Sequence, residues 1–535
     1  MTLRVKSLLA AGTIASSLIA APAFARTEIT PYLEASQVVV ADLKNDDVLT
    51  YSSIAAGVDA TVQTSRTQAQ VAYRYERRIG WGQRLDDGDV HSGLARVSHE
   101  LVNNTLNIEA GALATRARGD IRGAAPGLLV GDVDNVSQVY SAYAGPTLST
   151  NVGQLQVNAA YRLGYTKVEA TDFVAGTGQP QLDSFDDSIQ HQANVSVGMA
   201  PGTMLPFGWT VSGAYEREDA GQLDQRFEAK GVRGDIIYPV TPTIALLAGA
   251  GYEDIQASQR PPVFDATGNP VVDSKGRFVT DKTSPRAIAY DFDGIYWDVG
   301  VAWKPSRRTN LEAHVGRRYG SMSYTGSFSW APTNDSSLQI GVYDQVQTFG
   351  QQLNDALSNA PTAFGTNRNA LANPFGGCVL ATSGDSPGSC FNNALQSVNG
   401  AVYRGRGASA LYSASRGKIS TSVGAGYSQR TYSVPGFASG FSLDGVKDES
   451  YYGFGNVGYR IDDRSSLDGS FFASLSDSGI AGAPNVLSTG ATGAYNRTFG
   501  RRLSATAAIG VYHYEIDGLD SQTTASALVG MRYSF

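Results

Sequence analysis

Residues 155–166 read LQVNAAYRLGYT, and this stretch decides the fold. Apolar or small side chains stand at every second position from Leu155 to Tyr165, and mostly polar ones, Arg162 among them, stand between. Because successive side chains of a β-strand point to opposite faces, the stretch predicts a strand with one apolar and one wetted face. The same alternation recurs over residues 295–304, 311–316 and 419–428.

The length of these stretches points to a membrane barrel rather than a soluble sandwich. They run for about ten to fourteen residues, near the roughly 9–11 that a tilted strand needs to cross a bilayer, whereas soluble strands average about five or six. Ala, Val and Leu occupy the middle of the apolar faces, and Tyr or Trp the ends, as in an apolar band between aromatic girdles. Short connections alternate with long ones, which cover roughly 117–136, 170–187, 257–292, 349–400 and 433–449. The prediction is an all-β, transmembrane, antiparallel up-and-down β-barrel.

The pattern predicts about 22 strands, with a range of 18–24, the first near 28–40 and the last near 522–535. The weakest strand signals lie at 188–200, 320–332 and 401–415. Residues 26–535 are thus expected to form one barrel, with long external loops near 257–292 and 349–400.

A barrel of this size encloses a lumen that its own wall side chains cannot fill. Plugged energy-coupled transporters carry a large N-terminal domain before the first strand, whereas here the strand pattern begins by Ile29, so no such domain is expected. Loops as long as 257–292 and 349–400 are usually functional or disordered. We therefore expect at least one of them to fold inward and constrict the lumen.

The final strand carries its own signal. Phe535 ends the chain, and Tyr533, Met531 and Val529 share its face. This arrangement resembles the C-terminal targeting strand that the barrel-assembly machinery recognises in outer-membrane proteins, and it makes that machinery an expected partner.

Residues 1–25 are predicted to be a cleaved signal peptide. Arg4 and Lys6 precede an apolar run that ends in Ala23-Phe24-Ala25, so cleavage is expected before Arg26. Export and a barrel together place the protein in the outer membrane of a Gram-negative bacterium, with membrane lipid as a partner. With 42 basic against 49 acidic side chains, nucleic-acid binding is not expected.

Charged residues on the polar faces of the strands are expected to point into the lumen, because burying a basic group in lipid costs about 2–4 kcal/mol at the midplane. They could tune permeation or pair across neighbouring strands to stiffen the wall, and the sequence leaves both readings open. The predicted lumen charges are Arg74, Glu76, Arg78, Glu109, Arg162, Asp298, Glu312, Arg318 and Arg460.

Cys378 and Cys390 are the only cysteines, and they share one loop of an exported chain. A disulfide is the expected state in an oxidising compartment. A metal site would need two more ligands, and no histidine lies nearby, so neither a metal nor a cofactor is expected.

The five histidines are scattered over different predicted strands and form no catalytic motif. Ser98-His99-Glu100 is the nearest approach to one, but on a strand His99 faces away from its two neighbours. We predict no catalytic residues and no enzyme activity.

A hairpin in the middle of the chain resembles a known family. Residues 303–311 read WKPSRRTNL, residues 316–320 read GRRYG, and residues 29–33, ITPYL, are similar to the start of such chains. These features resemble the outer-membrane β-barrels of exopolysaccharide loci associated with the PEP-CTERM sorting system. In this reading Trp303 anchors at the membrane interface and Pro305 presets the turn. The resemblance implies an association with surface-polysaccharide export or assembly, although the long cysteine-bearing loop departs from the family pattern.

Three functions follow from these features. The first is a porin-like channel, or a barrel associated with polysaccharide export, that passes small polar solutes or glycan. The second is a structural or adhesive outer-membrane protein whose lumen is blocked by a loop. The third, an outer-membrane hydrolase that would rely on His99 and His513, lacks a catalytic cluster.

Overall fold

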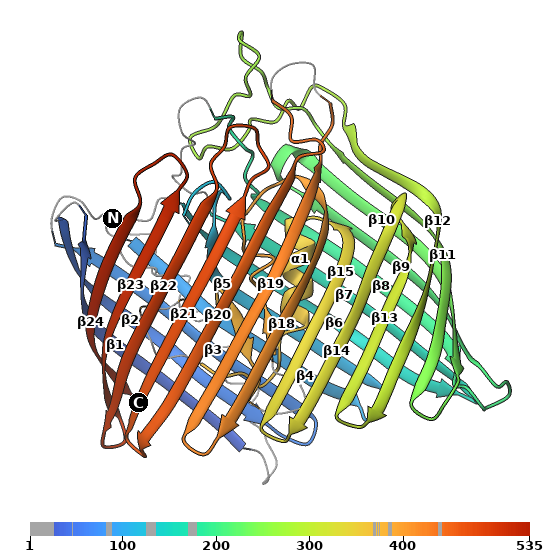
Figure 1. Ribbon diagram of the computed structural model, residues 1–535, viewed down its shortest axis with the longest axis horizontal. Helices are drawn as coiled ribbons and strands as arrows, with labels where there is room; N and C mark the ends of the chain where they lie inside the picture. Colours follow the sequence, from blue (N-terminus) through green and yellow to red (C-terminus); the bar gives the residue numbers. More distant parts are fainter. Residues whose placement is uncertain are drawn as a thin grey trace.

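The computed structural model describes residues 26–44, 47–81, 88–124, 135–169, 179–366, 371, 373, 375–382, 388–436 and 441–535. The chain forms a closed barrel of tilted strands, with short turns at one end and long loops at the other (Figure 1). The predicted signal peptide, residues 1–25, lies outside the described residues.

The wall of the barrel is one 22-stranded antiparallel sheet. Its first eleven strands are β1 (Arg26–Asp42), β2 (Asp47–Gln63), β3 (Thr67–Gly80), β4 (Gly88–Val102), β5 (Leu106–Arg118), β6 (Val136–Val152), β7 (Leu155–Val168), β8 (Asp187–Met199), β9 (Gly208–Ala220), β10 (Gln225–Pro239) and β11 (Ile244–Gln259). The other eleven are β12 (Ala287–Ser306), β13 (Thr309–Arg318), β14 (Ser321–Thr333), β15 (Ser336–Gln347), β18 (Val402–Arg416), β19 (Ile419–Ser433), β20 (Lys447–Asp462), β21 (Ser465–Asp477), β22 (Val486–Phe499), β23 (Leu503–Ile516) and β24 (Gln522–Ser534).

Each strand of the wall pairs with its neighbours in the chain, and β24 closes the barrel on β1 from Tyr32↔Ser534 to Asp42↔Thr524. The predicted up-and-down barrel of 22 strands is therefore confirmed. The three weakest strand signals correspond to β8, β14 and β18, each shifted by one residue or less.

The outer face is apolar, as the alternation predicts. Ile295 is 78% exposed, Ile509 69% and Val529 65%. Exposure of such large apolar side chains is unfavourable in water and favourable in the hydrocarbon of a bilayer. At the short-turn end an aromatic residue lies outward near the last position of many descending strands. These residues are Tyr238, Trp303, Trp330, Tyr459, Phe499 and Tyr533. The barrel therefore has the apolar band and girdle of an outer-membrane protein.

The hairpin between β12 and β13 corrects one detail of the sequence analysis. Pro305 lies inside β12, and the turn is at residues 307–308. The ladder between the two strands shifts register between Trp303 and Ser306. Pro305 therefore occupies a bulge, where its missing N–H breaks no ladder hydrogen bond, and it does not form the turn.

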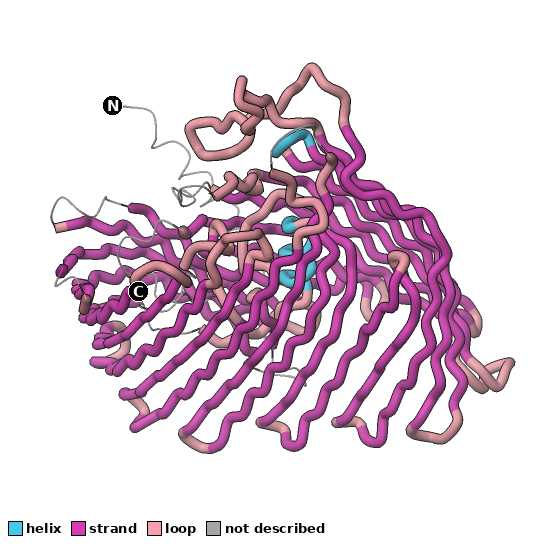
Figure 2. Tube along the Cα trace, turned by 45° about the horizontal axis from the view of Figure 1, so that its top comes forward, coloured by secondary structure: helices cyan, strands magenta, loops and turns pink. Residues whose placement is uncertain are grey.

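One connection leaves the loop end and enters the barrel. The segment 348–401 carries helix α1 (Phe349–Ser358) and a small hairpin of β16 (Cys378–Leu380) and β17 (Gly388–Cys390). Figure 2 shows α1 and the adjoining loop inside the ring of strands. We call this segment the inserted loop. Among the described residues, no helix is long and apolar enough to cross a membrane.

Candidate functional site

Helix α1 is fixed at its first turn by a buried carboxylate of the wall. Thr348 caps the helix by accepting a hydrogen bond from the Gln351 N–H, and the Gln351 side chain accepts one from the Thr348 N–H in return. The Thr348 hydroxyl also donates to Glu218 of β9, whose side chain is almost completely buried. The helix therefore begins where the wall supplies a hydrogen-bond acceptor for the hydroxyl of its capping residue.

The flank of α1 lies against β5–β8, where polar side chains interlock. Asn354 donates to Thr166 Oγ1 at 3.1 Å, and Arg162 reaches Asp355 at 3.1 Å. Burial raises the pKa of Asp355, while the Arg162 guanidinium opposes that shift. A Cβ on Gly164 would come within 2.8 Å of the Asn354 amide, so this wall position needs glycine for the helix to approach.

The far end of α1 is held by a cation. Arg96 of β4 donates to the carbonyl oxygen of Ser358 at 3.0 Å and packs over the ring of Tyr143. A positive charge at a helix C-terminus is stabilising. Both ends and one flank of α1 are therefore bonded to the wall.

Beyond the helix, the inserted loop builds an apolar core inside the barrel. Gln70 of β3 makes two hydrogen bonds with the backbone of Phe364, at 2.7 and 2.8 Å. Loop side chains such as Leu353, Phe364 and Phe391 are buried against wall residues that include Leu113. The loop near 349–400 therefore folds into the barrel, as predicted.

Cys378 and Cys390 form the predicted disulfide, and they are direct partners in the β16–β17 hairpin. The hairpin lies within the inserted loop, and Cys378 and Leu380 line a cavity of about 810 Å³. The disulfide therefore joins the two strands of a hairpin that lies beside the cavity.

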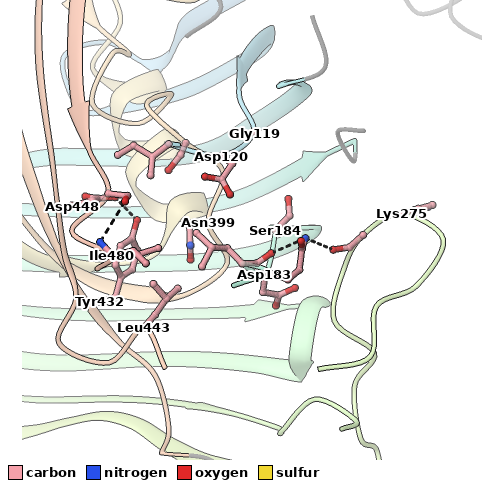
Figure 3. A pocket seen from close by; sticks show the side chains of 16 residues that line it. Gly119, Asp120, Asp183, Ser184, Lys275, Asn399, Tyr432, Leu443, Asp448 and Ile480 are labelled. Atoms are coloured by element: carbon pink, nitrogen blue, oxygen red, sulfur yellow. Dashed lines mark hydrogen bonds between the residues drawn. The ribbon is translucent and has the colours of Figure 1, made fainter. Parts of the chain in front are cut away.

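The outer mouth of the barrel is covered by several loops that bond to one another. Arg277 of the 260–286 loop donates to the carbonyl oxygens of Val168 and Phe185, and the N–H of Phe185 donates to Val398 of the inserted loop. Figure 3 shows Asp120, Asp183, Asn399, Tyr432 and Ile480 converging on a small cavity within this cover. The cavity measures about 40 Å³, room for a few water molecules at most.

A carboxyl group is buried in this cover. Asp183 accepts a hydrogen bond from the Gln222 amide at 2.6 Å and another from the Phe278 N–H at 3.1 Å. Burial raises the pKa of Asp183 to about 7, although these bonds and the nearby Arg277 favour its charged form. The cover thus closes around a group that titrates near neutral pH.

The end of the inserted loop is clamped by a buried arginine. Arg430 of β19 pairs with Asp448 of β20 and donates to Ser397 Oγ at 2.5 Å, and its side chain is 1% exposed. The guanidinium also lies between the rings of Tyr403 and Tyr432. Breaking a pair of this kind leaves a buried charge without a partner, which costs about 3–5 kcal/mol.

The structure pairs most of the predicted lumen charges with neighbours. Arg74, Glu76 and Arg78 of β3 form a chain of ion pairs that includes Glu34 of β1. Glu109 accepts a hydrogen bond from Asn107 at 3.1 Å. These charges are thus paired, whereas their effects on the stiffness of the wall and on permeation stay predictions.

Elsewhere on the lumen surface, the inner faces of β10–β14 carry a dense set of charges, which we call the charged wall. Asp298 pairs with Arg233 at 2.6 Å and with His314 at 2.8 Å, and His314 also bonds Glu312. Arg318 pairs with Glu253. All of these residues except Glu253 line a cavity of about 500 Å³. The last predicted charge, Arg460, is exposed near the short-turn end of β20.

The inner faces of β19–β22 differ, because hydroxyl, amide and aromatic groups dominate there. We call this surface the neutral wall. With the inserted loop it encloses a cavity of about 810 Å³. The polar residues of the wall that line it include Ser420, Ser422, Ser450, Asn456, Ser466, Asp468, Ser470, Ser474 and Thr492. Ser415, Ser420 and Ser466 lie beside the short turns, so the cavity extends to that end of the barrel.

Two functional residues were missed by the sequence analysis. Arg116 and Arg118 share the strand face of Ile108, which is exposed on the outside, so strict alternation would place them in lipid. Yet both line the 810 Å³ cavity. The sequence does contain a signal for this position. Two basic residues at alternate positions on a lipid-facing strand indicate that the strand has left the lipid there, because burying basic groups in lipid is unfavourable.

The reason is that the end of β5 separates from β4 while it stays paired with β6. The β4–β5 ladder ends at Gly93↔Ala114, while β5–β6 continues to Arg118↔Val136. The Gln138 amide fills the break by donating to the carbonyl oxygens of His91 and Thr115, both at 2.9 Å. Arg118 then reaches Ser476 Oγ on β21 at 2.7 Å.

The residues considered for catalysis are not grouped. His99 bonds the Thr67 hydroxyl, Ser98 bonds Asn107, and His513 bonds the Thr523 hydroxyl. Within the described part of the chain, no three His, Cys, Asp or Glu side chains are placed to hold a metal ion.

No family model and no curated protein matches the chain. Solved structures that resemble it include the FrpB iron transporter of Neisseria meningitidis, with 10% identity, 95% of this chain and 82% of that chain covered, and a TM-score of 0.43. The ferric-catecholate import receptor Fiu of E. coli K12 shares 10% identity over 94% of this chain and 81% of its own, with a TM-score of 0.44. OccK5 of Pseudomonas aeruginosa shares 8% identity over 95% and 98%, with a TM-score of 0.30. Likenesses this distant assign no function, and the resemblance to exopolysaccharide-locus barrels stays a prediction.

Proposed function

We propose that the protein is an outer-membrane channel for small polar solutes, whose lumen is constricted by the inserted loop and whose outer mouth is closed by a cover of loops. The observation that carries the proposal is the 810 Å³ polar cavity between the inserted loop and the neutral wall. A barrel with a purely structural role does not require a polar cavity that extends to the short-turn end.

The orientation follows the rule for outer-membrane barrels, with short turns in the periplasm and long loops outside. The cavity then opens towards the periplasm, and the cover of loops faces the exterior. Arg277, Phe185 and Val398 join three separate connections in that cover. Opening the channel therefore requires these loops to separate.

The alternative is a structural or adhesive protein whose lumen stays blocked. The bonds that fix α1 at both ends favour it, because they make the inserted loop a firm part of the barrel. A role in surface-polysaccharide export is a narrower form of the channel proposal and rests on the sequence resemblance alone.

Planar-bilayer conductance of a loop-deleted variant tests the proposal. Residues 349–400 are replaced by a short Gly-Ser turn that joins β15 to β18, which is feasible because Gln347 and Tyr403 are partners in the ladder. We expect brief or rare openings for the native protein and a several-fold larger, steady conductance for the variant.

A matched control removes residues 265–269, the tip of an exposed loop, and should leave conductance unchanged. Heat-modifiable migration on gels confirms that each variant forms a barrel. Silence of both the native protein and the loop-deleted variant, with the barrel intact, would favour the structural alternative.

A further inference from the structure

The 810 Å³ cavity gathers polar atoms that the protein itself leaves unbonded. Gln396 is 8% exposed, yet neither its amide nitrogen nor its amide oxygen has a hydrogen-bond partner among the described residues. The same holds for Tyr452 Oη, Ser474 Oγ and Arg118 Nε. All four residues line this cavity. Buried polar groups are normally bonded, so unbonded groups on four residues that line one cavity favour a polar occupant there.

Strand register brings these groups to one place. Tyr452 of β20 is the direct cross-strand partner of Ser474, and Ser450 is the partner of Ser476. Ser476 accepts the hydrogen bond of Arg118. Gln396 precedes Ser397, which is clamped to Arg430 beside the same strands. The unbonded atoms therefore converge near the outer end of the cavity.

Arg116 adds a second positive charge to the cavity. It lies two residues before Arg118 on the same strand face and lines the cavity. Among the described residues, neither arginine forms an ion pair with a carboxylate, whereas the arginines of the charged wall do. The one acidic side chain that lines the cavity, Asp468, is bonded to Asn496 and Ser466 near the short turns. The outer end of the cavity is thus suited to an anion.

The remaining surface suits rings that carry hydroxyl groups. Tyr452, Phe454 and Phe472 line the cavity. Gly426 and Gly490 make room for two of these rings against the wall, since a Cβ at either glycine would come within 2.5 Å of a ring atom. Serine, threonine and asparagine side chains stand beside them as donors and acceptors.

We propose that this cavity binds a small anionic, polyhydroxylated solute of the sugar-acid type. Its carboxylate would lie against Arg116 and Arg118, and its hydroxyl groups against Gln396, Tyr452 and Ser474. A volume of about 810 Å³ lies within the usual range for small-molecule sites. The inference deepens the proposed channel function by naming the class of solute, and it rests on that function for its physiological meaning.

Isothermal titration calorimetry of the detergent-solubilised full-length protein tests binding without reference to conductance. The probes are D-glucuronate, which carries both features, D-glucose, which lacks the charge, and acetate, which lacks the hydroxyl groups. We expect glucuronate to bind at least about tenfold more tightly than either of the others, since loss of a charge-assisted hydrogen bond has roughly that effect.

The variant R116Q removes the charge of a side chain that supports no ion pair in the described residues, and it should weaken glucuronate binding about tenfold. Y452F removes one unbonded hydroxyl and should weaken it about threefold. R501Q, which removes the same charge from an exposed turn, is the matched control and should bind as the native protein does.

Equal binding of acetate and glucuronate, or native affinity in R116Q, would overturn the proposal. Binding of glucuronate without any conductance would support the site and count against the channel. Conductance without glucuronate binding would leave the channel standing and remove the assigned solute class.

Discussion

The charged wall of β10–β14 and the neutral wall of β19–β22 face the same lumen but use their polar groups differently. In the charged wall, Arg233, Asp298 and His314 bond one another. Beside the other cavity, Tyr452 of the neutral wall and Gln396 of the inserted loop carry polar atoms with no hydrogen-bond partner among the described residues. Polar groups that satisfy each other stiffen a wall, whereas polar groups left unsatisfied are available to a solute. Charge alone therefore does not indicate where a solute binds.

The largest expected effect comes from breaking the charged wall. Asp298→Ala removes the shared partner of Arg233 and His314, and we expect it to cost about 2–3 kcal/mol of stability. Ser470→Ala in the neutral wall removes one hydrogen bond to Thr492 and should cost about 1 kcal/mol or less. The temperature at which half of each variant shifts from folded to unfolded migration on a gel measures both losses of stability. Equal losses would mean that the two walls do not differ as described.

The second effect concerns the cover of loops at the outer mouth. The pKa of Asp183 is raised from 3.8 to about 7 in the closed cover, so closure takes up a proton between about pH 4 and pH 7. Closure is therefore most favourable below this window and weakens as the pH rises through 7. We expect the open probability in bilayers to increase from pH 5 to pH 8.

The control for this pH effect is Asp183→Asn, which cannot ionise and keeps an acceptor for Gln222 and the Phe278 N–H. Its open probability should depend much less on pH over the same range. Arg277 also acts on Asp183 and pairs with Asp186. A native response that survives in the Asn variant would assign the titration to another group.

The smallest effect tests α1, which stands between the two walls. Gly164→Val places branched methyl groups against Asn354 and should loosen the helix by about 1–2 kcal/mol. Gly231→Ala is the control, because its new Cβ would meet only ordinary contacts of 3.5 Å or more. We expect more frequent channel openings in the first variant alone, measured in bilayers.

Much of the fold could be predicted because alternation is a local property. Even the three strands with the weakest sequence signals, β8, β14 and β18, begin and end within one residue of their predicted bounds. The disulfide followed from two cysteines in one exported loop. The partners of Arg162 and Arg318 could not be predicted, since Asp355 and Glu253 lie far away in the chain.

Alternation failed where the pairing between neighbouring strands is interrupted. Arg116 and Arg118 follow the outward parity of β5, and only the break in the β4–β5 ladder turns them into the lumen. Pro305 was expected in a turn and lies in a bulge, because register with β13 decides where the hairpin closes. Both errors arise from pairing between strands, which a single strand's pattern does not contain.

By itself the sequence determined a closed barrel with an oily outside and a wet inside, because the two-residue period of a strand fixes which side chains share a face. It also determined that the lumen needed further material, because 22 strands enclose more space than wall side chains can fill. Only the tertiary structure decided which loop supplies that material and which polar groups remain unbonded beside it. Those outcomes depend on contacts between segments such as Gln70 and Phe364, far apart in the chain, and no local pattern encodes such contacts.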